Sequence, residues 1–375
     1  MIVLKFGGTS VGTAESIRQV AQIITKINTP KIVVLSAVSG TTNTLVQICS
    51  DLKSGLKENA ILNSNVLYDS YLSLIDDLYE TSLYRERARD FIGEEFSNLK
   101  SLIKNETETN LEEIIVAQGE LLSTNLVQLY LEESTISSSL ISAFDFMKID
   151  ENGEPIIDYI SKKLIPIVAE NPKENLWITQ GFICRNHLGK IDNLQRGGSD
   201  YTASLIGAGI NADEIQIWTD IDGMHNNDPR FVDNTFSIEE ISFDEAAELA
   251  YFGAKILHPQ SLIPAKENNI PVLLKNTFSP EKKGTIIKNK TVANGVTAIA
   301  AKDGITAIKI KSYRMLLAYG FLKKVFEVFE KYQTPIDMIT TSEVAISLTI
   351  DDISYLAVII SELEAFGKVE VDSEL

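Results

Sequence analysis

The sequence has 375 residues, of which 44% are hydrophobic and 23% charged, and this composition is typical of a globular protein long enough for two domains. A formal net charge of −18 argues against a nucleic-acid or anionic-membrane surface, although a nucleotide needs only a local cluster of basic groups. We therefore expect no nucleic-acid partner and no membrane partner, and no apolar segment is long enough to span a bilayer.

Cysteine and histidine content bears on compartment and metal chemistry. Cys49 and Cys184 are too few for a disulfide framework, and Met1 leads directly into an apolar run rather than a signal peptide. These features predict a protein of the reducing cytoplasm. The three histidines lack the spacing of metal ligands, so we predict no metal site formed by the protein alone.

The first stretch with chemical meaning is Lys5 to Gly12, with the sequence KFGGTSVG. Ile2 to Phe6 predicts a buried strand, and Gly7 and Gly8, which have no Cβ, let the backbone turn sharply and approach a ligand. The spacing of apolar residues predicts a helix over 13–27. A strand, a glycine turn and a helix N-terminus, with a lysine at the strand end, can bind an anion. The alternative is an ordinary tight turn with a solvated lysine.

A second strand, Lys31 to Ser36, is of the buried β-branched kind found in parallel sheets. It leads into a hydroxyl-rich loop over 37–43 and then into a helix from Leu45. In open α/β sheets ligands bind beyond the carboxyl ends of strands, so both loops are predicted to lie at one rim. Ser36 and Thr42 are candidate ligand contacts, although such residues also serve as plain turn and capping residues.

Residues 51–110 are helical in pattern and carry no motif. The next predicted helix, 112–125, contains Gly119, and an isolated glycine inside a helix costs about 1 kcal/mol relative to alanine. This predicts that another segment approaches the helix closely at that point. Glu120 beside it would ordinarily be a surface charge.

A second glycine turn lies near the middle of the chain. Strands are predicted over 137–144 and 177–183, and Gln195 to Asp200 (QRGGSD) then precedes a helix over 201–206. An arginine and an aspartate bracket the two glycines of this turn. Two turns of this kind suit one long anion or two anionic ligands.

Alternating strands and helices continue to about residue 290 and predict an α/β fold with a mostly parallel sheet covered on both faces. Asp220 follows one of these strands and is itself followed by a polar loop over 223–230. Lys255 lies in the segment that closes the next helix. The elements are strands over 214–219 and 271–276, the latter predicted to be the last strand of this part, and a helix over 243–252.

A polar stretch at 291–295 predicts a boundary between two domains, 1–293 and 294–375. The second part has the order strand, helix, strand, strand, helix, strand, which is that of a small ferredoxin-like α+β module. The predicted ranges are 296–310, 320–329, 336–339, 344–350, 353–366 and 368–371.

Absent motifs narrow the chemistry. The sequence has no P-loop, no dinucleotide-binding glycine motif, no protein-kinase landmarks and no nucleophile elbow. The lysines, arginine, carboxylates and glycine turns that remain suit phosphoryl transfer, in which positioning and charge neutralisation do most of the catalysis. The lack of a histidine base is compatible with a carboxylate acceptor, which is already ionised at pH 7, although Asp200 or Asp220 could serve as a base.

Together these segments resemble the aspartokinases across nearly the whole chain. The matches, in the family's order, are Lys5–Val11, Ser36–Asn43, Gly119–Glu120, Arg196–Asp200, Trp218–Arg230 and Phe252–Pro259. The resemblance implies the amino-acid-kinase α/β sandwich with a mostly parallel central sheet, followed by ACT-type regulatory modules. It also implies transfer of a phosphoryl group from ATP, with Mg²⁺ carried by the nucleotide, to L-aspartate, giving 4-phospho-L-aspartate for lysine, threonine and methionine synthesis.

The resemblance further implies roles for single residues. Lys5 would neutralise charge on the transferring phosphoryl group, Arg196 would hold the substrate α-carboxylate with its planar fork, and Glu120 would face the α-amino group. Catalytic roles fall to Lys5, Asp200, Gly8 and Ser10. Substrate binding falls to Ser36, Thr42, Glu120, Arg196 and Ser199. Nucleotide binding falls to Gly7, Thr219, Asp220, His225, Arg230 and Lys255. Position 225 departs from the family pattern, because related sequences carry tyrosine there.

The second part resembles the lysine-inhibited branch of the family, which implies L-lysine as an effector. The residues implied for its pocket are Met315, Gly320, Phe321, Leu322, Asp337, Ser342 and Glu343. The alternative is that these are turn and strand residues of any ACT module. Relatives continue with a second ACT module, which we expect to be incomplete or absent here, either because the sequence is a truncated form or because the enzyme keeps a single module. The resemblance implies a homodimer or higher homo-oligomer, with pairing through ACT sheets.

Two rival functions are compatible with the same scaffold. Another amino-acid kinase would act on glutamate, acetylglutamate or a nucleoside monophosphate, and the pair of Arg196 and Glu120, which suits a free α-amino acid, argues against the last two. A non-catalytic amino-acid sensor would not need Lys5, Arg196 and Asp200 intact.

Overall fold

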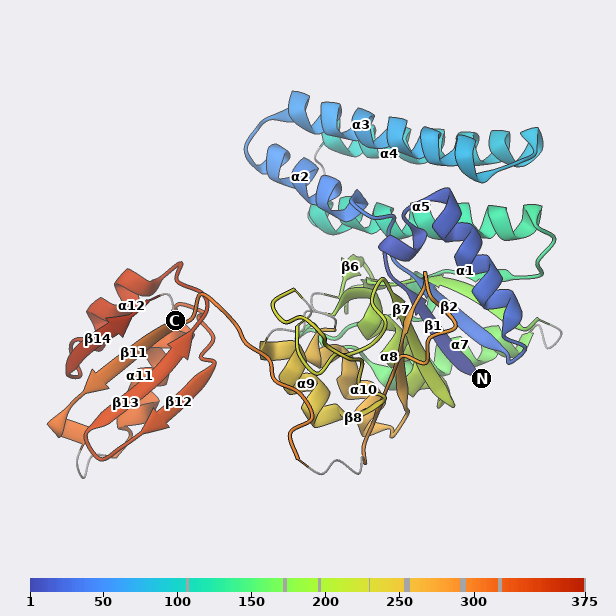
Figure 1. Ribbon diagram of the computed structural model, residues 1–375. Coiled ribbons are helices and arrows are strands. Elements are labelled where there is room, and N and C mark those ends of the chain that lie inside the picture. Colours follow the sequence, from blue (N-terminus) through green and yellow to red (C-terminus); the bar gives the residue numbers. More distant parts are fainter. Residues whose placement is uncertain are drawn as a thin grey trace. The chain divides into compact units, whose positions relative to one another are not determined.

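The computed structural model describes residues 1–105, 108–170, 174–194, 197–228, 230–252, 257–290, 295–315 and 319–373. It divides into two compact units, Met1–Ala300 and Ala301–Leu375 (Figure 1). The predicted boundary between residues 293 and 294 lies in a segment, 291–294, outside the described residues. Among the described residues, no helix has the length and apolar character needed to cross a bilayer.

The larger unit is built on an eight-stranded sheet with β1 (Ile2–Phe6) near its centre. Strand β1 runs parallel to its two neighbours, β2 (Lys31–Leu35) and β7 (Glu214–Thr219). Among the described strands of this sheet, only β9 (Val272–Asn276) and β10 (Thr285–Lys288) pair antiparallel. The mostly parallel sheet predicted from the sequence is therefore confirmed. The strand order is β3 (Ser139–Ile141), β4 (Leu176–Gln180), β2 (Lys31–Leu35), β1, β7 (Glu214–Thr219), β9 (Val272–Asn276), β10 (Thr285–Lys288) and β8 (Glu240–Ser242).

Helices cover both faces of this sheet, and the alternation of side chains along β1 assigns residues to them. Ile2, Leu4 and Phe6 pack into one core, whereas Val3 packs into the other. Lys5 therefore lies on the same face of β1 as Val3, and helix α8 (Gly198–Ile210) packs on this face. The first core includes residues of α1 (Ala14–Lys26), α2 (Thr41–Lys53), α3 (Lys57–Leu78), α4 (Ser82–Asn105) and α5 (Leu111–Glu133). The second includes residues of α6 (Ala143–Phe146), α7 (Ile157–Glu170), α8 (Gly198–Ile210), α9 (Phe243–Phe252) and α10 (Ile263–Glu267).

Several predicted boundaries differ from the structure. The helix predicted to begin at Leu45 begins at Thr41, because Gly40 takes a left-handed conformation (φ 84°) at its N-cap. The run 177–183 divides between β4 and a short hairpin of β5 (Ile183–Arg185) and β6 (Ile191–Asn193). The prediction that 271–276 is the last strand was wrong, since β10 follows it. Short strands such as β8 and β10 depend on their neighbours in the sheet and carry little periodicity of their own.

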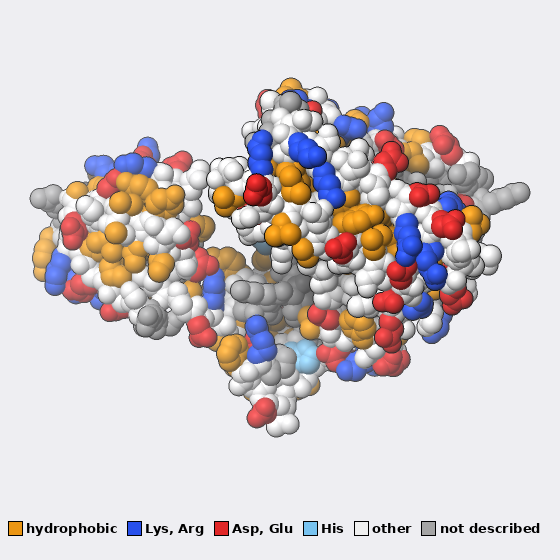
Figure 2. Space-filling model, turned by 90° about the horizontal axis from the view of Figure 1, so that it is seen from above, with side chains coloured by type: hydrophobic (Ala, Val, Ile, Leu, Met, Phe, Trp, Pro, Cys, Tyr) orange, Lys and Arg blue, Asp and Glu red, His pale blue; other side chains and the backbone are white. Residues whose placement is uncertain are grey.

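The smaller unit is an antiparallel four-stranded sheet with two helices, in the order expected of a ferredoxin-like module. Its core is formed by buried residues such as Ile308, Phe329 and Leu348. Hydrophobic side chains also gather on the face of this unit that Figure 2 shows. Tyr313 and Phe326 are among the exposed apolar residues of the unit. The elements are β11 (Thr306–Lys311), α11 (Phe321–Lys331), β12 (Met338–Thr341), β13 (Ala345–Ile350), α12 (Leu356–Leu363) and β14 (Lys368–Asp372), with strand order β12-β13-β11-β14.

Candidate active site

The glycine turn after β1 packs directly on the loop after β2. Gly7 N donates to Trp218 O at 3.1 Å, and Ser39 N donates to Gly8 O at 3.2 Å. A Cβ on Gly8 would lie only 3.0 Å from Ala37 O, so a side chain would push the two loops apart. A short 3₁₀ helix, η1 (Thr9–Val11), follows the glycines before α1 begins. The two rim loops predicted from the sequence thus lie against each other.

Lys5 forms an ion pair across the sheet–helix interface. Its Nζ lies 2.6 Å from Asp200 Oδ1, and only 11% and 15% of the two side chains are exposed. Asp200 stands in the first turn of α8, on the sheet face that Lys5 shares with Val3. A Cβ on Gly7 would lie 3.5 Å from Lys5 Nζ, so the ammonium group sits directly beside the glycine turn.

Helix α5 approaches the second loop at Gly119. A Cβ on Gly119 would lie 2.9 Å from the Cβ of Ala37, which is closer than real Cβ contacts allow, and 3.5 Å from Thr41 Cγ2. The close approach predicted from the isolated glycine is therefore confirmed. Its effect is to bring the next residue, Glu120, against the loop, where its Oε1 accepts a hydrogen bond from Ala37 N at 3.3 Å.

Glu120 is a buried acid with half of its carboxyl unpaired. Only 3% of the residue is exposed, and within the described part of the chain Oε2 has no hydrogen-bond partner. Burial raises the pKa of Glu120 to about 8, and the hydrogen bond from Ala37 only partly opposes this. An incoming ammonium group would supply both the missing partner and the compensating charge.

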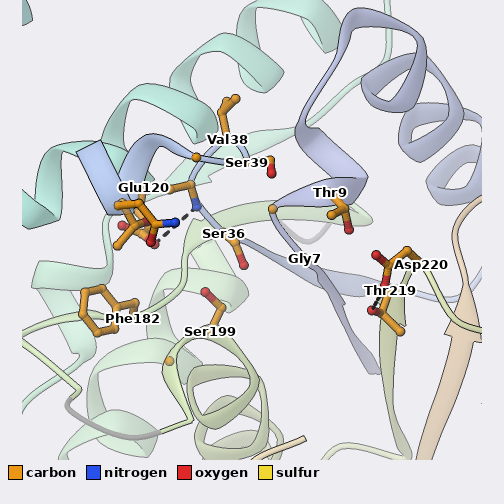
Figure 3. Close-up of a pocket in the computed structure, with 16 residues that line it drawn as sticks. Gly7, Thr9, Ser36, Val38, Ser39, Glu120, Phe182, Ser199, Thr219 and Asp220 are labelled. Atoms are coloured by element: carbon orange, nitrogen blue, oxygen red, sulfur yellow. Dashed lines mark hydrogen bonds between the residues drawn. The ribbon is translucent and has the colours of Figure 1, made fainter. Parts of the chain in front are cut away.

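These elements enclose a cavity of about 500 Å³ at the carboxyl ends of β1, β2 and β7 (Figure 3). Glu120 lies toward one side of it in this view, with Thr219 and Asp220 toward the other, and the hydroxyls of Ser36 and Ser199 lie between. Eight predicted site residues are brought together as its lining: Gly7, Gly8, Ser36, Thr42, Glu120, Ser199, Thr219 and Asp220.

Other predicted residues lie away from the cavity lining. Ser10 is fully buried and its Oγ lies 2.7 Å from Thr277 Oγ1, because η1 turns its side chain inward, so it is not placed to donate to a ligand. His225 is held between Asp222 (Nε2–Oδ1 2.9 Å) and Thr235 (Nδ1–Oγ1 3.0 Å). Arg230, which is largely exposed, pairs with the Asp228 carboxylate. Arg196 and Lys255 lie outside the described residues.

The loop that carries His225 is stabilised by Asp222. This carboxylate lies 2.6 Å from Lys282 Nζ and also pairs with His225, and the two partners hold its pKa at about 2. The ring nitrogens of His225 are both engaged, so the ring can offer a neighbour only its face.

Sequence reasoning missed some of the cavity lining. Thr9, Val38, Ser39 and Asn43 also contribute, and all belong to the two rim loops that had been identified. Phe182 is the important omission. It lies two residues after the end of β4, and its position beyond the carboxyl end of a parallel strand was the available signal.

The residues predicted for an effector pocket divide between the two ends of β12. Ser342 and Glu343 follow the strand, near the end of β11 from which η3 (Tyr313–Met315) continues, whereas Asp337 precedes it. Asp337 lies five residues from Ser342 along extended chain, which corresponds to roughly 16 Å. The remaining predicted residues, Met315, Gly320, Phe321 and Leu322, lie between β11 and the first turn of α11.

Among the described residues, no group of three His, Cys, Asp or Glu side chains is arranged to hold a metal ion. Asp200 and Asp220 are single carboxylates near the cavity. Such a set suits Mg²⁺ that arrives with a nucleotide, because Mg²⁺ retains water and phosphate oxygens and needs only one or two protein carboxylates.

Comparison with known proteins gives consistent matches. Residues 1–276 match the amino acid kinase family. The chain is 33% identical over 387 residues to lysine-sensitive aspartokinase 3 of Escherichia coli K12, covering all of this chain and 85% of that protein. It is 38% identical over 368 residues to chloroplastic aspartokinase 3 of Arabidopsis thaliana, covering 93% of this chain and 64% of that one.

The solved structures that match this chain belong to the same kind of protein as these relatives. The structure of E. coli aspartokinase III in complex with aspartate and ADP superimposes with a TM-score of 0.83 at 33% identity, covering all of this chain and 85% of that one. The same enzyme in complex with lysine and aspartate gives a TM-score of 0.83.

Proposed function

The chain belongs to the amino acid kinase family and, within it, to the aspartokinases, and we propose that the cavity described above is where it transfers the γ-phosphoryl group of ATP to the side-chain carboxylate of L-aspartate. The observation that carries the assignment of the site is the half-unpaired carboxyl of Glu120 in the same cavity as the glycine turn beside Lys5.

Lys5 acts on the transferring phosphoryl group. Phosphoryl transfer spreads negative charge over the equatorial oxygens, and a preorganised cation next to a glycine turn stabilises that charge. Asp200 holds the lysine ammonium in place through their ion pair. Gly7 and Gly8 let the phosphates approach the backbone closely.

L-Aspartate binds at the Glu120 side of the cavity. Its α-ammonium group pairs with the Glu120 carboxylate, and hydroxyls of Ser36, Thr42 and Ser199 are available to its carboxylates. We assign the grip on the α-carboxylate to Arg196. The acceptor carboxylate is already ionised, so the reaction needs no general base.

The nucleotide lies toward Thr219 and Asp220. Asp220 would be the carboxylate available to Mg²⁺ that arrives with the nucleotide, and the ion would supply neutralisation of phosphate charge. We assign supporting nucleotide contacts to Arg230 and Lys255, and to the face of the His225 ring, whose nitrogens are already engaged.

L-Lysine is the proposed effector of the smaller unit. Because Asp337 and Ser342 lie at opposite ends of β12, one module does not bring both to a single small ligand. β12 is an edge strand of the described sheet and its residues are exposed. Antiparallel pairing of two β12 edges would set Asp337 of one protomer beside Ser342 of its partner, which supports a homodimer with effector sites at the shared edge.

We also place the protein in the cytoplasm. Its two cysteines, Cys49 and Cys184, are both free and buried, which suits a reducing compartment.

The test is ADP release with L-aspartate, L-glutamate or N-acetylglutamate as acceptor, with and without L-lysine. Lys5→Ala should lower kcat by about 10²–10³-fold, the size of effect seen when one transition-state charge contact is removed. The matched control is Lys26→Ala, at the exposed end of α1, which should leave the rate unchanged. Turnover with glutamate alone would indicate a glutamate kinase. Lysine binding without turnover on any acceptor would favour a non-catalytic sensor.

A further inference from the structure

Phe182 holds an unfavourable backbone conformation inside the cavity wall. Its φ is 65°, in the left-handed region that bulky residues rarely occupy. It lies between β4 and β5 and lines the cavity together with Glu120. Strain of this kind persists only where the surrounding structure enforces it.

One buried hydroxyl helps to hold Phe182 in this conformation. Thr202, in the second turn of α8, is fully buried, and its Oγ1 accepts a hydrogen bond from Phe182 N at 2.8 Å. The same hydroxyl donates to Gly198 O at 3.3 Å. On the other side of the residue, Leu194 N donates to Phe182 O at 2.7 Å. The donor and acceptor capacities of Thr202 are therefore both used between Phe182 and the first turn of α8.

The neighbouring residue packs equally tightly. A Cβ on Gly181 would overlap Ser199, another residue of the cavity wall. The corner of Gly181 and Phe182 and the start of α8 thus form one continuous piece of wall, and Thr202 ties its two parts together. In Figure 3 the Phe182 ring lies on the Glu120 side of the cavity, away from Thr219 and Asp220.

We propose that Thr202 is a positioning residue for the amino-acid half of the site: its hydroxyl holds Phe182 in the left-handed conformation, so that the ring closes the cavity wall near Glu120. This role rests on the proposed function, in which Glu120 binds the substrate ammonium. The ring limits water around the carboxylate and thereby strengthens the ion pair that the substrate makes there.

Loss of the hydroxyl should weaken acceptor binding selectively. Without it, the partly buried Phe182 N–H loses its hydrogen-bond partner, and the backbone gains by relaxing out of the left-handed region. The ring then leaves its place near Glu120. The nucleotide side, formed by Thr219 and Asp220, does not depend on this contact.

The experiment compares three variants of the full chain. Thr202→Val keeps the shape of the side chain but removes the hydroxyl, and Thr202→Ser restores the hydroxyl. Ser204→Ala, two residues further along the same helix, is the matched control, because Ser204 is equally buried but its hydroxyl has no hydrogen-bond partner among the described residues.

We expect Thr202→Val to raise KM for L-aspartate about tenfold with KM for ATP unchanged, while Thr202→Ser and Ser204→Ala stay within about twofold of the parent. Hydrogen exchange of the Phe182 amide should accelerate at least about tenfold in Thr202→Val only.

Equal increases in both KM values, or an unchanged KM for aspartate, would overturn the proposal, since a merely structural role affects both substrates alike. Unchanged exchange at Phe182 in Thr202→Val would also overturn it, because the hydroxyl would then not hold the residue. If the parent protein showed no aspartate-dependent turnover, the proposed function would fail, and the exchange measurement would still decide whether Thr202 holds Phe182.

Discussion

Glu120→Gln tests the electrostatics of the site most directly, because the free protein holds this carboxyl largely protonated. With a pKa of about 8, Glu120 is ionised in about a tenth of the molecules at pH 7, and ionising it there costs about 1.4 kcal/mol. A substrate ammonium group must be matched by the ionised form. KM for L-aspartate should therefore fall about tenfold for each pH unit from 6 to 8 and level off above about 8.

Removing the titrating group should remove this dependence. In Glu120→Gln, KM for L-aspartate should be raised at pH 8 and nearly constant from pH 6 to 8.5, with KM for ATP little changed. Glu113→Gln, on the same helix, is the control and should keep the parent profile. Steady-state assays at saturating ATP across this pH range give the answer.

The same carboxyl should leave a signature in stability. Its pKa is higher in the folded protein than its ordinary value of 4.5, so stability is greatest below that value and falls as pH rises toward 8. Relative to Glu120→Gln, the unliganded parent should lose about 1.4 kcal/mol per pH unit between roughly pH 5 and 8. The reasoning would be refuted if KM for L-aspartate kept the parent's pH dependence in Glu120→Gln. It would also be refuted if the stabilities of the parent and the variant changed in parallel with pH.

Two further substitutions test contacts that shape the site. Gly119→Ala should lower the free energy of unfolding, measured with urea, by about 1–3 kcal/mol and raise KM for aspartate, because the new Cβ would lie 2.9 Å from the Cβ of Ala37. If adding Ala37→Gly did not restore the lost stability, this close contact would not be the cause. Ser10→Ala should lower the free energy of unfolding by about 1–2 kcal/mol, because it leaves the Thr277 hydroxyl unpaired. The double variant Ser10→Ala/Thr277→Val should lose less stability than the two single variants together, and strictly additive losses would show that the 2.7 Å contact contributes nothing.

The sequence alone determined the elements with strong local patterns. Ile2–Phe6 and Lys31–Ser36 are apolar runs bounded by turn residues, and both are central strands of the observed sheet. The order of elements in the smaller unit followed from the same periodicity. Gly119 was informative because a glycine inside a helix lowers its stability, which indicates that no side chain fits at that position. The structure shows the cause, since Ala37 approaches the helix closely there.

The candidate site could be predicted in part, because glycine turns at the ends of parallel strands meet at one rim. Resemblance to the aspartokinases supplied the individual roles. Neither source fixed which side chains face the cavity: Ser10 follows the glycines in sequence, yet the 3₁₀ turn rotates it into the core against Thr277.

Only the tertiary structure decided the contacts that join distant segments. The ion pair of Lys5 with Asp200 forms because α8 packs on the face of β1 that carries the Lys5 side chain. Nothing in the local sequence around either residue specifies this pair. The protonated state of Glu120 depends on burial, which comes from the whole surrounding fold. Phe182 adopts a conformation opposed to its own preference, since Thr202 from a separate helix supplies the compensating hydrogen bond. Local sequence encodes periodicity and turn chemistry, whereas burial, pairing and strain are properties of segments brought together by folding.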